Sequence, residues 1–300
     1  MLYIVGGKFM NIWRMNIKTS NKNAFEFCRG NNILGIGWPL DKLPKDQEEA
    51  EKLGRERYRK ARGYITAIRV LYRMQINDLV WTRDNNNVYY LCRVLSDVKH
   101  SEKEENIKYD VCHYVDVDFI KIGGQENVPG IVVNNFRAPN STSIINHEDI
   151  GIESLIKTIY NDNTKTEFRY ETEEITNFWN MLLPEDVELV VSLYLQKELD
   201  YMIYPNTNQK DTKKYEFTMV NRNDNSKACV QVKTGKVILD KNEFKELAKN
   251  YTVYLFTTYD KYIGEGENII IIDKAKLTKF VLDNECIMPQ QIKSWIKYLK

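Results

Sequence analysis

The segment KKYEFTMVNRNDNSKACVQVKTG (213–235) contains two β-favouring runs separated by the cluster NDNS. Asn and Asp tolerate positive φ, so this cluster favours a tight turn and the segment predicts an antiparallel hairpin. Side chains two positions apart on a strand leave the same face, so Gln231 and Lys233 point together. The cysteine and valines around them can feed a core on either side. A polar pair on such a strand needs a reason.

The segments around this hairpin predict helices packed against a central sheet. LPEDVELVVSLYLQKE (183–198) has Pro184 and acidic residues in its first turn and then an apolar face, the pattern of a helix start. After the hairpin we expect a helix at 241–250, a buried strand at 252–258, a strand at 268–274 and a final helix or two. This order is typical of a mixed α/β domain.

The first half of the chain has a different pattern. Four segments predict strands: 11–19, the apolar end of 24–38, a hairpin over 76–98 around the DNNN cluster, and 108–123. The charged segment 46–74 and the start of 24–38 predict helices. We therefore expect an α/β chain, α+β overall, with a strongly curved β domain at 1–145, a connecting segment at 146–179 and the mixed domain at 180–300.

Composition excludes several kinds of site. The five cysteines are scattered and never form a CxxC pair, and there are only three histidines, which argues against disulfide frameworks, zinc clusters and His-rich metal sites. With 43 basic and 42 acidic residues, any nucleic-acid surface must be a local patch. No apolar run reaches bilayer length, so we expect a soluble cytoplasmic protein without a membrane partner.

The hairpin explains the polar pair if Glu216 on the first strand meets Gln231 and Lys233 on the second, with Glu188 joining from the preceding helix. Carboxylate and amide oxygens are hard ligands that suit Mg²⁺, and a lysine ammonium can orient water or offset phosphate charge. Phosphodiester hydrolysis needs this combination. The alternatives are Asp211 or Asp224 in place of Glu216, Glu185 in place of Glu188, and an ordinary half-solvated strand.

The order Glu188, Glu216, Gln231-Val232-Lys233 resembles the PD-(D/E)xK nuclease superfamily, in the QxK form of Mrr-like restriction endonucleases, over about residues 180–285. The resemblance implies a restriction-endonuclease-like sheet flanked by helices. It also implies Mg²⁺, or Mn²⁺ as an alternative, held by Glu216, Gln231 and the carbonyl of Val232, with Lys233 positioning water and Glu188 in support. The family usually has Asp where Glu216 stands.

The first half resembles the PUA-like and EVE-type domains that precede nucleases in modification-dependent restriction enzymes. The resemblance lies in NIWRMNI (11–17), GIGW (35–38) and INDLVWTRDNNNVYYLCRV (76–94), with Asn77 where glycine is usual. It implies a reader that stacks a flipped base between aromatic side chains. The candidate walls are Trp13, Trp38, Trp81 and Tyr89, although aromatic side chains on strands more often belong to the core.

Arginines on the predicted helices could contact the nucleic-acid backbone: Arg55, Arg59 and Arg62. The alternative is a solvated helix face, because Glu51 and Glu56 are interleaved with them. Together these features predict a modification-dependent, type IV-like endonuclease that acts on double-stranded DNA containing a modified base, with modified cytosine as the first choice. The alternatives are a nuclease reading unmodified sequence, a non-catalytic reader of modified nucleic acid, and an adaptor. Cutting both strands with one site per chain usually calls for two protomers, so a homodimer is an option.

Overall fold

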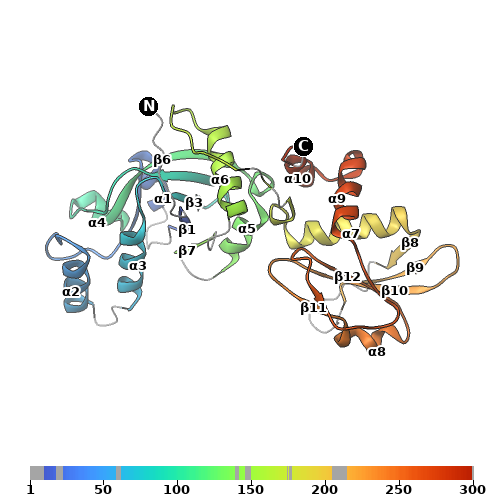
Figure 1. The fold of residues 1–300 in the computed structure, drawn as a ribbon. Coiled ribbons are helices and arrows are strands. Elements are labelled where there is room, and N and C mark those ends of the chain that lie inside the picture. The colour runs from blue at the N-terminus through green and yellow to red at the C-terminus, as the bar shows by residue number, and fades with distance from the viewer. Residues whose placement is uncertain are drawn as a thin grey trace. The chain divides into compact units, whose positions relative to one another are not determined.

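The computed structural model describes residues 10–17, 23–58, 62–138, 142–145, 150–173, 175, 178–204 and 215–298. The chain divides into two compact units, Met1–Thr176 and Asn177–Lys300. Each unit combines helices with a β-sheet, which confirms the predicted α/β class with a curved first sheet and a mixed second one (Figure 1). Within the described ranges, no helix is long and apolar enough to cross a membrane.

The described part of the first unit alternates short helices with strands. Its strands are β1 (Ile12–Met15), β2 (Ile33–Ile36), β3 (Leu79–Arg83), β4 (Tyr89–Val94), β5 (Lys99–His100), β6 (His113–Gly123) and β7 (Thr142–Ile144). Its helices are α1 (Ala24–Gly30), α2 (Gln47–Arg57), α3 (Arg62–Arg73), α4 (Glu104–Tyr109), α5 (Gly130–Arg137) and α6 (Ile150–Asn163), with a 3₁₀ turn at Gln125–Asn127.

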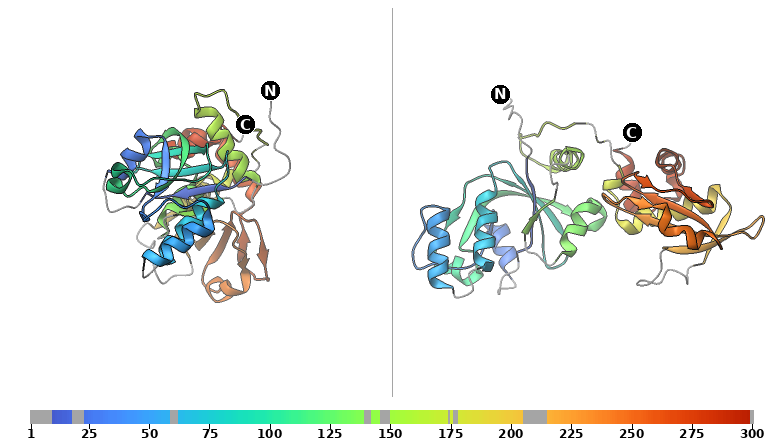
Figure 2. Two further views of the ribbon diagram at one scale, coloured as in Figure 1. Left: turned by 90° about the vertical axis from the view of Figure 1, so that its left-hand side faces the viewer. Right: turned by 60° about the horizontal axis from the view of Figure 1, so that its bottom comes forward.

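These strands form a seven-stranded sheet in the order β2-β6-β4-β3-β1-β7, with β5 also paired to β6. One face buries Trp13, Val80 and Cys92 in a core to which Phe25 of α1 and Leu71 of α3 contribute. On the other face, Tyr89 of β4 meets the Phe136 ring of α5 edge-on, with centroids 5.3 Å apart. Helices α2 and α3 lie side by side, drawn in blue in Figure 2, and share a core with Trp38 (Figures 1 and 2).

Asn and Asp form the predicted turn between β3 and β4. The Asp84 carboxylate accepts hydrogen bonds from the backbone N–H groups of Asn86 and Val88 at 2.8 and 2.9 Å, and Asn87 has φ 59°. Just before β3, Asn77 has φ 73° and its side-chain oxygen accepts a hydrogen bond from Arg93. Asn therefore adopts the left-handed conformation where the resembled domains use glycine.

The segment after β7 belongs to the first unit. Helix α6 and residues 164–173 cover Arg93, which donates from Nε to the Tyr160 hydroxyl at 2.9 Å and lies 4.1 Å from the Phe168 ring centroid. The Tyr170 hydroxyl donates to the carbonyl of Asn77 at 2.7 Å. Much of the segment predicted to connect the two domains is therefore held against β4 and the residues before β3 by partly buried hydrogen bonds and ring contacts.

The second unit begins with a 3₁₀ turn at Phe178–Asn180 and helix α7 (Pro184–Glu198). Its strands are β8 (Tyr201–Tyr204), β9 (Phe217–Asn221), β10 (Lys227–Lys233), β11 (Leu239–Asp240), β12 (Thr252–Thr257), β13 (Tyr262–Ile263) and β14 (Ile269–Ile271). Its other described helices are α8 (Lys245–Ala248), α9 (Lys274–Asp283) and α10 (Gln290–Ile296), with 3₁₀ turns at Lys241–Phe244 and Glu285–Ile287.

Five of the described strands of the second unit form a sheet in the order β14-β12-β10-β9-β8, and β11 and β13 pair separately. β10, β12 and β14 are parallel, whereas β9 pairs antiparallel with β10 as the hairpin predicts. Helix α8 lies on one side of this sheet and α7 and α9 lie on the other (Figure 1). Pro184 opens α7, and the Asp186 carboxylate accepts a hydrogen bond from the Leu183 N–H at 3.2 Å, as the start signal predicts.

Candidate functional sites

Glu216, Gln231 and Lys233 meet at one end of the β9–β10 hairpin. The Glu216 N–H donates to the Val230 carbonyl at 2.8 Å, which places Glu216 beside β10 just before β9 begins. Gln231 Nε2 donates to Glu216 Oε1 at 2.5 Å, and Lys233 Nζ lies 3.6 Å from the same oxygen. The polar pair on β10 therefore faces a carboxylate on the neighbouring strand, as its spacing predicts.

The three side chains differ in burial. Gln231 is 5% exposed, whereas the side chains of Glu216 and Lys233 are 22% and 45% exposed. Gln231 Nε2 also donates to the Val232 carbonyl at 3.1 Å, so one amide nitrogen bridges two oxygens. The end of the hairpin therefore carries a buried amide, a partly exposed carboxylate and an ammonium that reaches solvent.

Thr258, which the sequence analysis did not predict as a site residue, fixes the backbone after Lys233. The Thr258 N–H donates to the Lys233 carbonyl at 3.0 Å, and the Thr258 hydroxyl accepts from the Gly235 N–H at 2.9 Å. Lys274 Nζ donates to the Thr258 carbonyl at 2.8 Å, and burial lowers the pKa of Lys274. A Thr-Thr pair at the end of the apolar strand TVYLFTT was the available signal.

The rival acidic residue Asp224 does not occupy the same place as Glu216. Asp224 lies in the turn at the far end of the hairpin, where its carboxylate accepts from the Ser226 N–H at 2.8 Å, while Asp211 lies outside the described residues. Glu188 is half-buried on α7, and Glu185 is exposed in the first turn. Among the described residues, no three His, Cys, Asp or Glu side chains cluster as a metal site, so the predicted ligand set draws on an amide and a carbonyl.

Three of the four aromatic residues predicted to line a base pocket are buried in the first unit. Trp13, Trp81 and Tyr89 are each at most 1% exposed. Trp13 packs in the core under α1 and α3, and its Nε1 donates to an Asp78 carboxylate oxygen at 2.7 Å. Trp13 and Trp81 point to opposite faces of the sheet, because Trp13 is in register with Val80. The structure does not bring these three rings together as the walls of an open pocket.

Trp38, in contrast, is half-buried and held in an unusual backbone conformation. Its φ is 70°, which is rare for a bulky side chain. Its N–H donates to Asp110 Oδ1 at 3.3 Å and its carbonyl accepts from His113 Nε2 at 2.9 Å. Its ring meets Tyr58 and Tyr64 edge-on, with centroids 5.1 and 6.0 Å away. Backbone strain held by tertiary contacts is typical of functional sites.

A hydrogen-bonded chain of neutral rings supports the Trp38 carbonyl. Because that carbonyl only accepts, His113 carries its proton on Nε2, and its Nδ1 accepts from His100 Nδ1 at 2.5 Å. His100 Nε2 then accepts from the Tyr72 hydroxyl at 2.9 Å. Burial lowers the pKa of both histidines, and for His100, where the His113 charge adds to the effect, to about 4.

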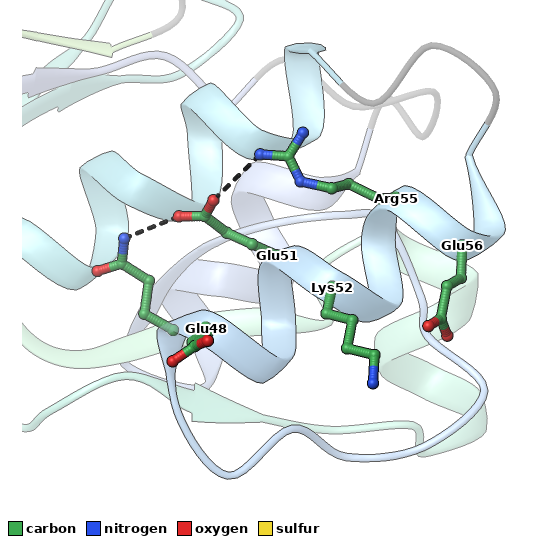
Figure 3. A pocket seen from close by; sticks show the side chains of 6 residues that line it. Glu48, Glu51, Lys52, Arg55 and Glu56 are labelled. Atoms are coloured by element: carbon green, nitrogen blue, oxygen red, sulfur yellow. Dashed lines mark hydrogen bonds and ion pairs between the residues drawn. The ribbon is translucent and has the colours of Figure 1, made fainter.

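The predicted backbone arginines are divided. Arg55 is exposed and forms an ion pair with Glu51 at 3.4 Å on α2 (Figure 3), Arg62 is exposed at the start of α3, and Arg59 lies outside the described residues. Arg69 and Gln47 also donate hydrogen bonds to the Glu51 carboxylate, and these hydrogen bonds lower the pKa of Glu51 to about 2. The solvated, ion-paired helix face therefore describes Arg55 well.

Comparison with known proteins leaves the family open. No family model matches the chain, and no curated protein matches it. Among solved structures, the chain is similar to the YTH domain of the Zygosaccharomyces rouxii MRB1 protein, determined in complex with N6-methyladenosine RNA. The identity is 9%, the match covers 53% of this chain and 91% of that one, and the TM-score is 0.29. A TM-score this low carries no argument.

Proposed function

We propose that this protein is a modification-dependent DNA endonuclease, in which the second unit hydrolyses phosphodiester bonds with a divalent cation and the first unit reads a modified base. The observation that carries the proposal is the meeting of Glu216, Gln231 and Lys233 around one carboxylate oxygen. An acid, an amide and a lysine on paired strands have a clear use in phosphodiester hydrolysis, and a core strand has no need for them.

The donor set fits a hard cation such as Mg²⁺. Gln231 Nε2 lies between Glu216 Oε1 and the Val232 carbonyl, at 2.5 and 3.1 Å. Turning the Gln231 amide about its last side-chain bond exchanges its nitrogen for its oxygen, so that three oxygens would face the same point. Oxygen donors of this kind suit Mg²⁺ or Mn²⁺, which would stabilise charge on a scissile phosphate. Glu188, the support that the sequence predicts, lies on α7, whereas Gln231 shares its face of the sheet with Cys229 and Leu255, which pack in the core beside α8.

Lys233 is proposed to act on the attacking water and the phosphate. Its ammonium is the most exposed of the three groups and lies 3.6 Å from Glu216, so it can reach a phosphate while staying beside the carboxylate. We assign to the Lys233 ammonium the positioning of the attacking water and the stabilisation of the hydroxide that forms as this water loses its proton to solvent. The bonds from Thr258 to the Lys233 carbonyl and to Gly235 fix the backbone from which this side chain extends.

We assign base reading to the surroundings of Trp38. It is the one predicted aromatic with an accessible part, and Asp110 and His113 hold it at positive φ. An aromatic face fixed in this way can stack on a flipped base, which supplies about 1–3 kcal/mol per base. Modified cytosine in double-stranded DNA remains the proposed target.

The test is a cleavage panel with purified protein and Mg²⁺. Otherwise identical DNAs would contain cytosine, methylcytosine, hydroxymethylcytosine or glucosylated bases. We expect cleavage of one modified DNA, at least about a thousandfold slower for Lys233→Met because the group that positions water is lost. Lys236→Met, at an exposed lysine three residues later, is the matched control and should cut normally.

Three outcomes separate the alternatives. Equal cleavage of all four DNAs would indicate a nuclease that reads unmodified sequence. Binding of a modified DNA without metal-dependent cutting would indicate a non-catalytic reader. Undiminished cutting by Lys233→Met would show that the active site lies elsewhere.

A further inference from the structure

Hydrogen-bond donors gather in one row on the face of the first sheet that carries Trp81. Arg14 on β1 is in register with Trp81 on β3 and with Ser143 on β7. Arg83, two residues beyond Trp81, points to the same face and is in register with Tyr89. Each of these residues has at least one N–H or O–H group, so the row is rich in donors.

The row contains two neighbouring positive charges. Arg14 is fully buried and donates from Nε and Nη2 to the Ser143 hydroxyl, at 3.1 Å each. The guanidinium carbons of Arg14 and Arg83 lie 5.7 and 5.0 Å from the centroid of the Phe136 ring. No described carboxylate forms an ion pair with Arg83, and its Nη1 is 3.4 Å from the Tyr89 hydroxyl. Burial and the Arg83 charge both lower the pKa of Arg14.

Two further donors in the row have no partner. Trp81 Nε1 and Asn16 Nδ2 are buried and form no hydrogen bond in the described structure. Asn16 follows Arg14 by two residues and is 8% exposed, so it continues the row beside Arg83. Buried donors without an acceptor are rare in folded proteins, and each calls for an explanation. An anion with several acceptor oxygens would satisfy both donors beside the charge of Arg83.

We infer that Arg14, Arg83, Trp81 and Asn16 form a phosphate-binding site on the first unit. A phosphate presents charged oxygens in several directions, which matches the Arg83 guanidinium, the neighbouring charge of Arg14 and two N–H donors. The identity of the natural ligand rests on the proposed function: it is a backbone phosphate of the DNA, held apart from Trp38. Arg83 is half-exposed and provides the entrance.

Nuclear magnetic resonance of the full chain labelled with ¹⁵N-tryptophan tests the site directly. Inorganic phosphate, against chloride at equal ionic strength, should shift the Trp81 indole N–H signal, assigned with Trp81→Phe. Arg83→Gln should abolish the shift and Arg83→Lys should retain part of it, because a single charge remains without the fork. Arg29→Gln, on α1 over the opposite face, is the matched control and should behave as wild type. An unmoved Trp81 signal, or the same shift in Arg83→Gln, would overturn the site.

DNA binding then distinguishes the source of the phosphate. Arg83→Gln should weaken binding of modified and unmodified DNA alike, about three- to tenfold, and reduce the slope of log affinity against log salt by about 1. If the slope is unchanged while inorganic phosphate still moves Trp81, the assignment to DNA is wrong. Absence of modification-dependent cleavage with an intact Trp81 response would contradict the proposed function and leave the site standing.

Discussion

The hairpin end of the second unit and the aromatic residues of the first unit were predicted by the same reasoning, yet the structure treats them differently. Gln231 and Lys233 meet Glu216 on the paired strand. Trp13 and Trp81 are buried on opposite faces of their sheet, and Trp38 alone among the predicted base-pocket aromatics stays half-buried. A polar pair on a strand requires a partner, and hairpin register identifies it, whereas an aromatic side chain is equally satisfied in a core.

Substitution of Gln231 should give the largest effect. Gln231→Leu keeps the size and burial of the side chain but removes the group between Glu216 and the Val232 carbonyl. We expect hydrolysis of modified DNA to slow by about 10²- to 10³-fold with DNA affinity largely retained. Single-turnover cleavage measures the rate, and Gln290→Leu, at an exposed glutamine on α10, is the control. A rate within about twofold of wild type would make the trio an ordinary polar contact.

Trp13 tests the core side of the comparison. Trp13→Ala should lower the free energy of unfolding by about 3–5 kcal/mol, because it leaves a cavity in the core and removes the donor to Asp78. Urea denaturation followed by circular dichroism measures the change. Unchanged stability combined with lost base preference would indicate that Trp13 contacts the base.

Substitution of Trp38 should affect base preference more than stability, in contrast to Trp13. Trp38→Leu should reduce the preference for modified over unmodified DNA by about tenfold, in keeping with the loss of one stacking surface. Because the ring is half-buried, the loss of stability should be smaller than for Trp13→Ala. Fluorescence anisotropy with paired DNAs measures the preference. Full discrimination by Trp38→Leu would remove Trp38 from base reading.

The histidine chain beneath Trp38 predicts a pH effect on stability. The pKa of folded His100 is about 4, whereas an unfolded histidine has a pKa of about 6.5, so only the unfolded chain takes up this proton between those values. Stability is therefore full above about pH 6.5 and falls as the pH drops through the window. We expect a loss of about 1–2 kcal/mol after allowance for solvent screening. Urea titrations across the window measure it, and His100→Gln should reduce the pH dependence.

Arg55 should give the smallest effect. Because Arg55 is exposed and already paired with Glu51, Arg55→Gln should change DNA affinity by less than about twofold and leave the salt dependence unaltered. Salt titrations of DNA binding measure both quantities. A loss comparable with that expected for Arg83→Gln would show that the helix face contacts the backbone after all.

Local patterns predicted the longer strands, the two hairpin turns and the meeting of Gln231 with Glu216, because their determinants lie close together in sequence, but they missed the short strands β5, β7, β8, β11 and β13. Alternation and the NDNS cluster fix the β9–β10 hairpin, and hairpin register brings Gln231 to Glu216. The surroundings of Trp38 could not be predicted in this way. Its amide is bonded by Asp110, which follows 72 residues later and itself has φ 56°. Such contacts join residues that are far apart in the sequence, so no local pattern of residues predicts them.

The covering of Arg93 by α6 and residues 164–173 also determines where the chain can be divided. A fragment that ends at residue 145 would lose Tyr160, Phe168 and Tyr170, and so deprive the Arg93 guanidinium and the Asn77 carbonyl of these partners. Limited proteolysis should therefore spare residues 150–173. Separate expression of the half that is proposed to read a base calls for a fragment that extends at least to residue 173.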